Sequence, residues 1–182
     1  PEYDYSNQDW FTVARDKTDG VWSEPYIDEG GGNILMTTYS MPIRDNKGRL
    51  AAVLTADISL DWLTELVGEV DVYPTAFSMV ISREGEIMVC PAETLVMRAN
   101  IKELSSGMDD STNLRHLGEA MMSGKQGNTP VNLHGTKNHV YYAPIEKTGW
   151  SMSIVIPESE IYSGLKRMGR LVLLLQLLGL LM

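Results

Sequence analysis

One carboxylate stands out by its position in the sequence. Asp57 follows a nearly all-apolar run at residues 50–56 and directly precedes a helix signal, in which Ser59 is a good N-cap and Leu60 and Leu63 begin an apolar stripe. The apolar run predicts a buried strand, so Asp57 is expected where a buried strand gives way to a helix. A buried carboxylate is costly unless a cation or hydrogen-bond donors meet it. Asp57 is therefore either the anchor for a cationic group of a ligand or a cap of the following helix.

The other reactive residue types do not form a constellation. His116, His134 and His139 have no partners at metal-ligand spacing, so we interpret them as structural or surface residues. No Ser-His-Asp or Cys-His set is indicated. The single cysteine, Cys90, precedes a proline and is expected to be a buried strand cysteine. The sequence thus predicts no catalysis by this chain, no metal and no cofactor.

Composition narrows the class of protein further. The 182 residues are 43% hydrophobic, which allows a packed core, and the net charge of −9 argues against nucleic acid as a partner. One cysteine excludes an internal disulfide. The chain begins with Pro1 and ends in the apolar run 171–182 (LVLLLQLLGLLM). A membrane-spanning helix needs about 20 residues. We therefore expect a sequence cut at both ends, with the final run as the start of a transmembrane helix.

The first part of the chain predicts one short helix and an antiparallel hairpin. Trp10, Val13 and Ala14 lie at helical spacing, and Pro25 indicates an edge or irregular strand. Two further strands are expected to pair across a polar turn. The predicted elements are a helix at 9–15, strands at 21–27, 33–43 and 50–57, a turn at 45–48, and a helix from residue 59.

After a connector at residues 69–74 the pattern of strands restarts. Two strands, a helical turn, a longer helix and a three-strand meander follow, at residues 76–82, 87–90, 100–104, 113–122, 129–133, 137–144 and 150–156. This order predicts an α+β fold with antiparallel sheets.

A weak internal repeat links the two parts. Gly48 and Gly149 each open an apolar strand that leads directly into a helix, and the first strand ends at Asp57 where the second ends at Pro157. If the two parts share a fold, the charged pocket belongs to the first part only, and the second is a structural transmitter without one.

The arrangement resembles a double Cache (dCache) sensor domain, the extracytoplasmic part of bacterial chemoreceptors and sensor kinases. The pieces that carry the resemblance keep their order and spacing over most of the chain: residues 8–11 (QDWF), 22–28 (WSEPYID), 37–42 (TTYSMP), 48–60 and 141–157 (YYAPIEKTGWSMSIVIP). The resemblance implies two PAS-like units with antiparallel sheets. The membrane-distal unit spans residues 1–70 and is incomplete at its N-terminus, and the membrane-proximal unit spans 71–157. A linker helix and the start of a transmembrane helix follow at 158–182.

The same resemblance implies a function. The chain is expected to be the extracytoplasmic sensing domain, periplasmic or extracellular, of a homodimeric receptor in the cell inner membrane. It would bind a small molecule in the distal unit and signal to a cytoplasmic output domain, which can itself be catalytic. The alternative left open is an exported enzyme or binding protein with a lipid or helical anchor.

Site residues follow from the pattern of amino-acid-binding dCache domains, which is Tyr, Arg-x-Trp-Tyr, a later Tyr and an Asp. Tyr3 matches the first tyrosine, and Gln8 stands where the arginine is usual. The remaining matches are Trp10, Phe11 in place of tyrosine, Tyr26 and Asp57, and Tyr39 on the hairpin could line the pocket through its hydroxyl. Glutamine offers amide donors but no charge for a ligand carboxylate. The expected ligand is therefore an amine or amino-acid-like molecule without a strict α-carboxylate.

Overall fold

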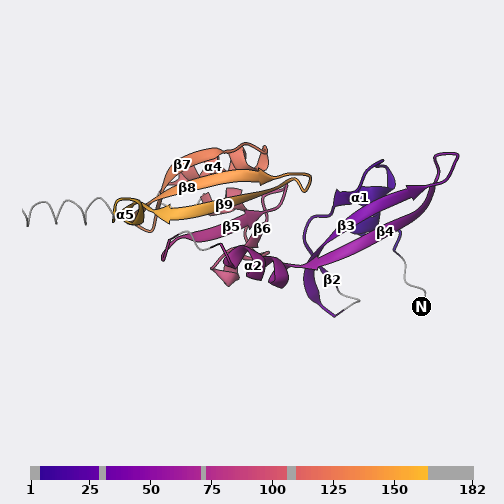
Figure 1. The fold of residues 1–182 in the computed structure, drawn as a ribbon, viewed down its shortest axis with the longest axis horizontal. Helices are drawn as coiled ribbons and strands as arrows, with labels where there is room; N and C mark the ends of the chain where they lie inside the picture. Colours follow the sequence, from indigo (N-terminus) through magenta and orange to yellow (C-terminus); the bar gives the residue numbers. More distant parts are fainter. Residues whose placement is uncertain (1–4, 29–31, 71–72, 106–109, 164–182) are drawn as a thin grey trace, which may run out of the picture.

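The computed structural model describes residues 5–28, 32–70, 73–105 and 110–163. Two antiparallel sheets with their helices form two units placed end to end along the long axis of the molecule (Figure 1). The predicted α+β fold with antiparallel sheets is confirmed. Tyr3 and the apolar run 171–182 lie outside the described residues. Within the described part of the chain, no helix is long and apolar enough to cross a membrane.

The first unit is built around one long strand. Strand β3 pairs along one edge with β4 and along the other with two short strands in succession, β1 and β2. The hairpin predicted across the turn at 45–48 is confirmed. Pro25 lies in the gap between β1 and β2, as expected of a residue with no N–H to donate. The elements are α1 (Asp9–Arg15), β1 (Val21–Trp22), β2 (Tyr26–Asp28), β3 (Ile34–Arg44) and β4 (Leu50–Ser59).

Burial of β4 differs from the prediction. Most residues of this strand are exposed, and Leu54 keeps 64% of its surface. An apolar run is buried only where a second layer covers it, and in the described part of the chain β4 is an outer strand paired on one side. The expectation of a buried strand ending in a buried Asp57 is therefore wrong, since Asp57 is exposed too.

Helix α2 (Leu60–Gly68) links the two units. It begins as predicted, because the Ser59 hydroxyl caps it by accepting a hydrogen bond from the Trp62 N–H at 3.2 Å. Its apolar face packs onto the sheet of the second unit, where a buried cluster forms from Leu60, Leu63, Val67, Val80, Met88, Val89 and Trp150. By its packing, α2 therefore belongs to the second unit, although it continues directly from the last strand of the first.

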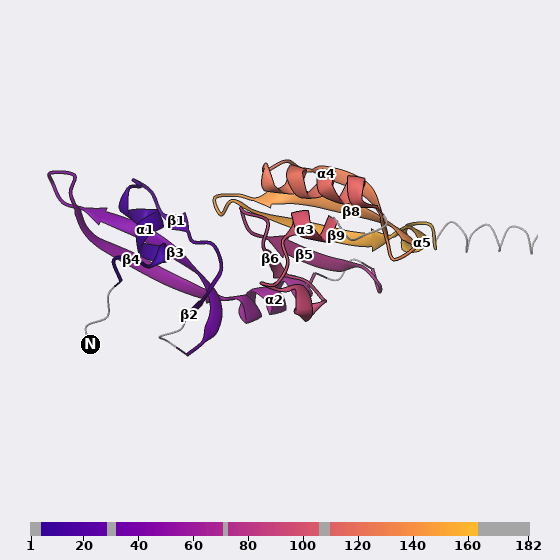
Figure 2. The ribbon, with the colours of Figure 1, turned by 180° about the vertical axis from the view of Figure 1, so that it is seen from behind.

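The second unit is a five-stranded antiparallel sheet in the order β6-β5-β9-β8-β7. Helices α3 and α4 cover one face (Figure 2), and α2 lies against the other. The predicted strands and helices are present, and the short η1 was not predicted. The elements are β5 (Phe77–Ile81), β6 (Ile87–Val89), η1 (Glu93–Leu95), α3 (Ile101–Ser105), α4 (Ser111–Met122), β7 (Gly127–Leu133), β8 (Thr136–Ile145), β9 (Trp150–Pro157) and α5 (Glu158–Ile161).

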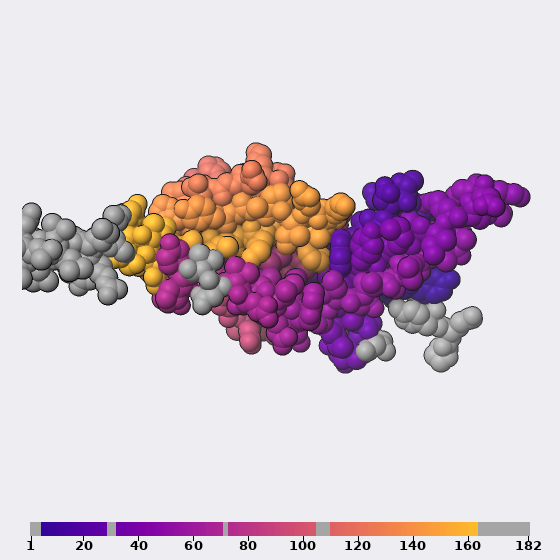
Figure 3. All heavy atoms as spheres, in the orientation of Figure 1, coloured from indigo at the N-terminus to yellow at the C-terminus, as the bar shows by residue number. Residues whose placement is uncertain are grey.

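Trp22 and Arg83 join the two units. The Trp22 ring lies between those of Tyr39 and Trp150, with ring centroids 5.2 and 5.0 Å apart. The Arg83 guanidinium donates a hydrogen bond of 2.9 Å to the Trp22 carbonyl and lies 3.8 Å from the Glu24 carboxylate. The space-filling view shows that the two units touch one another (Figure 3). A bridge of aromatic and polar contacts therefore supplements the covalent link through α2.

Candidate functional site

Asp57 is the end of a short hydrogen-bonded chain on the first sheet. Thr38 of β3 lies directly opposite Asp57 of β4, and its hydroxyl donates to the Asp57 carboxylate at 2.8 Å. The Tyr26 hydroxyl of β2 lies 2.7 Å from the same Thr38 oxygen. A threonine hydroxyl has one proton, so with that proton on Asp57 the Tyr26 hydroxyl is the donor to Thr38. Two strands thus supply the hydroxyl groups of a chain that ends at a carboxylate on a third strand.

This arrangement leaves Asp57 able to bind more donors. An ionised carboxylate accepts about four hydrogen bonds, and Thr38 supplies one. The carboxylate is exposed, so it keeps its negative charge available to a ligand at the surface. An ammonium or guanidinium group is the chemical partner that such an acceptor favours.

A one-residue irregularity in the hairpin selects the partner of Asp57. The register between β3 and β4 shifts between Ile43 and Arg44. The pairing of Arg44 with Leu50 at the turn would place Asp57 opposite Thr37, whereas beyond the shift Asp57 pairs with Thr38. Thr37 is buried and donates instead to the Ser23 carbonyl at 3.0 Å. The bulge therefore decides which threonine supports the carboxylate.

Helix α1 brings three aromatic rings together. The Tyr5 ring lies 6.2 Å from that of Trp10 and 5.1 Å from that of Phe11, and the latter two rings are 5.9 Å apart. The helix packs against β3 and β4, the strands that carry Thr38 and Asp57. The structure thus groups Trp10 with Phe11 as an apolar surface on a helix that packs against these two strands.

Gln8 occupies the N-cap of α1. Its backbone carbonyl accepts hydrogen bonds from Phe11 and Thr12 at 3.0 and 2.9 Å, while its side chain makes no capping hydrogen bond. The amide is therefore not committed to the helix end. Gln8 is half-buried, at the start of the helix that carries Trp10.

Tyr39 lies apart from this group. Side chains alternate along a strand, so Tyr39 projects from the face of β3 opposite to that of Thr38. Its ring stacks on Trp22, and its hydroxyl approaches the backbone so closely at Gly20 that a Cβ there would meet it. The structure does not bring Tyr39 together with Asp57.

The role of Asp57 as a helix cap is not what the structure shows, because Ser59 caps α2 and Asp57 lies within β4. Sequence reasoning missed two neighbours of the predicted residues, Thr38 and Tyr5. Tyr5 had a weak signal as an aromatic residue near the start of a predicted helix. Thr38 had no such signal, because its role depends on the register shift.

In the described part of the chain, no group of three histidine, cysteine or acidic residues is placed to hold a metal ion.

The first unit matches a known family of sensor domains. Residues 1–65 match the family described as the first PDC sensor domain of methyl-accepting chemotaxis protein-like proteins. The predicted resemblance to dCache sensor domains of chemoreceptors and sensor kinases is confirmed: the family match lies in the first unit, and the solved structures below share the fold.

The relatives with curated names are chemoreceptors. The chain is 27% identical over 169 residues to the methyl-accepting chemotaxis protein McpA of Pseudomonas putida, covering 91% of this chain and 24% of the relative. It is 31% identical over 102 residues to PscA of Pseudomonas syringae pv. tomato, covering 56% of this chain and 16% of the relative. The chain therefore spans about a quarter or less of the length of the curated relatives it matches.

Solved structures share the fold over both units. The extracellular domain of mmHK1S-Z3, described as a histidine kinase, has a TM-score of 0.76 at 22% identity, covering 92% of this chain and 59% of that structure. The ligand-binding domain of the amino acid chemoreceptor PctB of Pseudomonas aeruginosa, in complex with L-Arg, has a TM-score of 0.67 at 20% identity, covering 88% of this chain and 64% of that structure.

Proposed function

We propose that this chain is the extracytoplasmic sensing domain of a homodimeric transmembrane receptor. In this proposal the first unit binds a small amine or amino-acid-like molecule and the second passes the signal toward a cytoplasmic output domain. The observation that carries the proposal is the exposed Asp57 carboxylate, which Thr38 and Tyr26 orient through a directed pair of hydrogen bonds. Structural neighbours are titled as complexes with L-Arg, L-serine and asparagine, all of which carry an ammonium group.

The ligand is selected at both ends. Asp57 binds the ammonium or guanidinium group, while the amide of Gln8 makes neutral hydrogen bonds to the other end, and Trp10 and Phe11 form the apolar wall. The family pattern assigns Tyr3 to the same ligand site. Without an arginine to pair with it, an α-carboxylate gains little at the Gln8 position. The site therefore accepts an amine as readily as the corresponding amino acid.

Calorimetry on the purified chain tests this with pairs that differ only in the α-carboxylate, agmatine with L-arginine and ethanolamine with L-serine. Asp57→Ala should weaken binding about tenfold or more, since the bound ligand covers the carboxylate and truncating one partner of a covered charge pair costs about 2 kcal/mol or more. Gln8→Ala should cost only about 1 kcal/mol. Gln8→Arg should shift preference toward the amino acids.

The matched control is Asp61→Ala, which removes an exposed carboxylate four residues further along, on α2. It should leave affinity unchanged. Equal affinity of the Asp57→Ala variant and the wild-type chain for the tightest-binding probe would remove the basis of the proposed site.

We place the described residues outside the cytoplasm, with residues 158–182 leading into the inner membrane. The similar structure of mmHK1S-Z3 is described as an extracellular domain, which supports this placement. Reporter fusions to the intact protein check it: a reporter that is active only outside the cytoplasm should work when joined within residues 73–157. Activity of a cytoplasm-only reporter at the same joints would contradict the placement.

A further inference from the structure

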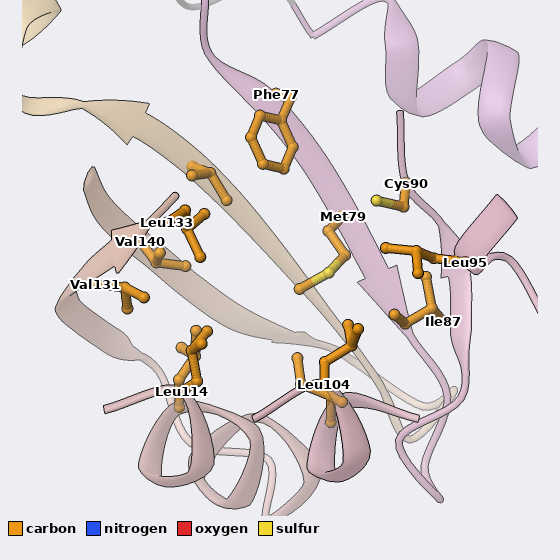
Figure 4. Close-up of a pocket in the computed structure, with 13 residues that line it drawn as sticks. Phe77, Met79, Ile87, Cys90, Leu95, Leu104, Leu114, Val131, Leu133 and Val140 are labelled. Atoms are coloured by element: carbon orange, nitrogen blue, oxygen red, sulfur yellow. The ribbon is translucent and has the colours of Figure 1, made fainter. Parts of the chain in front are cut away.

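The second unit contains an apolar cavity that the proposed amine site does not use. It lies between the sheet and helices α3 and α4 and has a volume of about 100 Å³. Figure 4 shows Leu114 on the same side of the pocket as Val131, Leu133 and Val140, and Leu104 on the side of Met79 and Ile87, with space between the two groups. The remaining lining residues are Phe77, Met79, Ile87, Cys90, Leu95, Ile101, Leu117 and Val155.

The chemistry of the lining restricts what can enter. All thirteen side chains are apolar or sulfur-containing, and none carries a charge or an amide. A charged group moved into such surroundings loses its hydration and finds no partner there, which costs far more than an apolar contact returns. Amino acids and amines, the ligands proposed for the first unit, are therefore excluded from this cavity.

The size of the cavity sets the ligand class. An apolar cavity of about 150 Å³ lined by Leu, Ile and Phe stays dry and binds benzene or xenon. The present cavity is of the same order and is lined in the same way. Water gains no hydrogen-bond partners on these walls, so a small hydrocarbon that fills the space meets little competition.

We propose that this cavity is a second binding site, which takes a small uncharged apolar molecule such as a single aromatic ring. This goes beyond the proposed function, because the ligand differs in chemistry and the site lies in the other unit. The site also adjoins the outgoing end of the chain: Val155 lines it, and the same strand runs two residues further to Pro157 and α5.

Fluorobenzene binding to the full chain, followed by fluorine NMR, tests the proposal. Saturable binding is expected for fluorobenzene and none for benzoate, which has the same ring with a charge. Leu133→Phe adds bulk to the cavity wall and should weaken fluorobenzene binding by roughly tenfold or more. The larger side chain takes up room that the ligand needs, so the cavity would be overpacked with both present. The matched control is Ile154→Phe, which adds a ring to another half-buried position, on the opposite face of the sheet, and should leave binding unchanged.

Cys90 provides a second measurement on the unmodified chain. It is the only cysteine, it lines the cavity, and burial raises the pKa of its thiol, so alkylation by iodoacetamide should be slow. Saturating fluorobenzene should slow it further by occupying the adjacent space, and benzoate should not. Absence of saturable binding overturns the proposal. So does binding that neither protects Cys90 nor weakens in a folded Leu133→Phe variant. Because agmatine and ethanolamine report on the first unit, failure there does not alter this result.

Discussion

Asp45 holds the tip of the β3–β4 hairpin with four hydrogen bonds or ion-pair contacts from two residues. Its carboxylate accepts from the Lys47 and Arg49 N–H groups at 2.8 and 2.9 Å and lies 2.8 Å from both Nε and Nη2 of Arg49. These donors lower the pKa of Asp45 below its ordinary 3.8, and the Arg49 backbone N–H contributes most. The turn that positions β4, and with it Asp57, therefore depends on an ionised side chain.

The pH dependence of the turn follows from this lowered pKa. A carboxylate whose folded-state pKa is depressed stabilises the fold at pH values above its unfolded pKa, and the contribution is lost as pH falls through the folded pKa. The turn should therefore weaken only below about the ordinary Asp value of 3.8. A carbon-detected NMR titration of the Asp45 carboxyl should show this. Arg49→Ala should raise the pKa only partway toward the ordinary value, because the Arg49 backbone N–H remains.

Lys47→Ala is the control for that titration. It removes a nearby positive charge but keeps the only Lys47 group that bonds to Asp45, its backbone N–H. The pKa should stay as in the wild-type chain. Identical titration of the Arg49→Ala variant and the wild-type chain would show that the side-chain contact does not contribute.

At the scale of elements, periodicity and capping were sufficient for most of the fold. The helix at 9–15 and the start of α2 after Ser59 were predicted to the residue, because each has a local signal in spacing or cap chemistry. The burial of β4 was not predictable, since it depends on which layer covers a strand and not on the strand's own residues. Pro25 predicted an edge or irregular strand at 21–27, and the structure divides this segment into β1 and β2 on either side of the proline.

The candidate site was predictable in its residue types but not in its geometry. Asp57 and Tyr26 were named from a family pattern, and the structure joins them through Thr38. That link depends on a single register shift near the turn, which no composition or periodicity signal reports. The position of Tyr39 on the opposite face follows from the same register. A site on a sheet is thus determined by pairing between strands, which sequence patterns specify weakly.

At the scale of the molecule, Trp22 is the residue through which the units contact one another most directly. Its ring packs against one aromatic residue from each unit, Tyr39 and Trp150. Aromatic pairs contribute about 0.5–1.5 kcal/mol each beyond the area they bury. Trp22→Ala should therefore lower the free energy of unfolding of the full chain by about 1–3 kcal/mol, as measured by urea denaturation.

Trp62→Ala is the matched control for Trp22→Ala. Trp62 lies on α2 with 51% of its surface exposed, so its removal should change the free energy of unfolding by no more than about 0.5 kcal/mol. If the two variants lose the same stability, the aromatic contact between the units does not stabilise the molecule.

The packing of α2 onto the second sheet also has a consequence for synthesis on the ribosome. All four strands of the first sheet precede α2 in the chain, so they can pair while the rest is still being made. The cluster that covers the apolar face of α2 is complete only once Trp150 has been made. At about 5–20 residues per second, the roughly 90 residues between Leu60 and Trp150 take on the order of 10 s to appear. During that interval Leu60, Leu63 and Val67 lack part of their covering residues, so this surface of the nascent chain is accessible to a holdase chaperone.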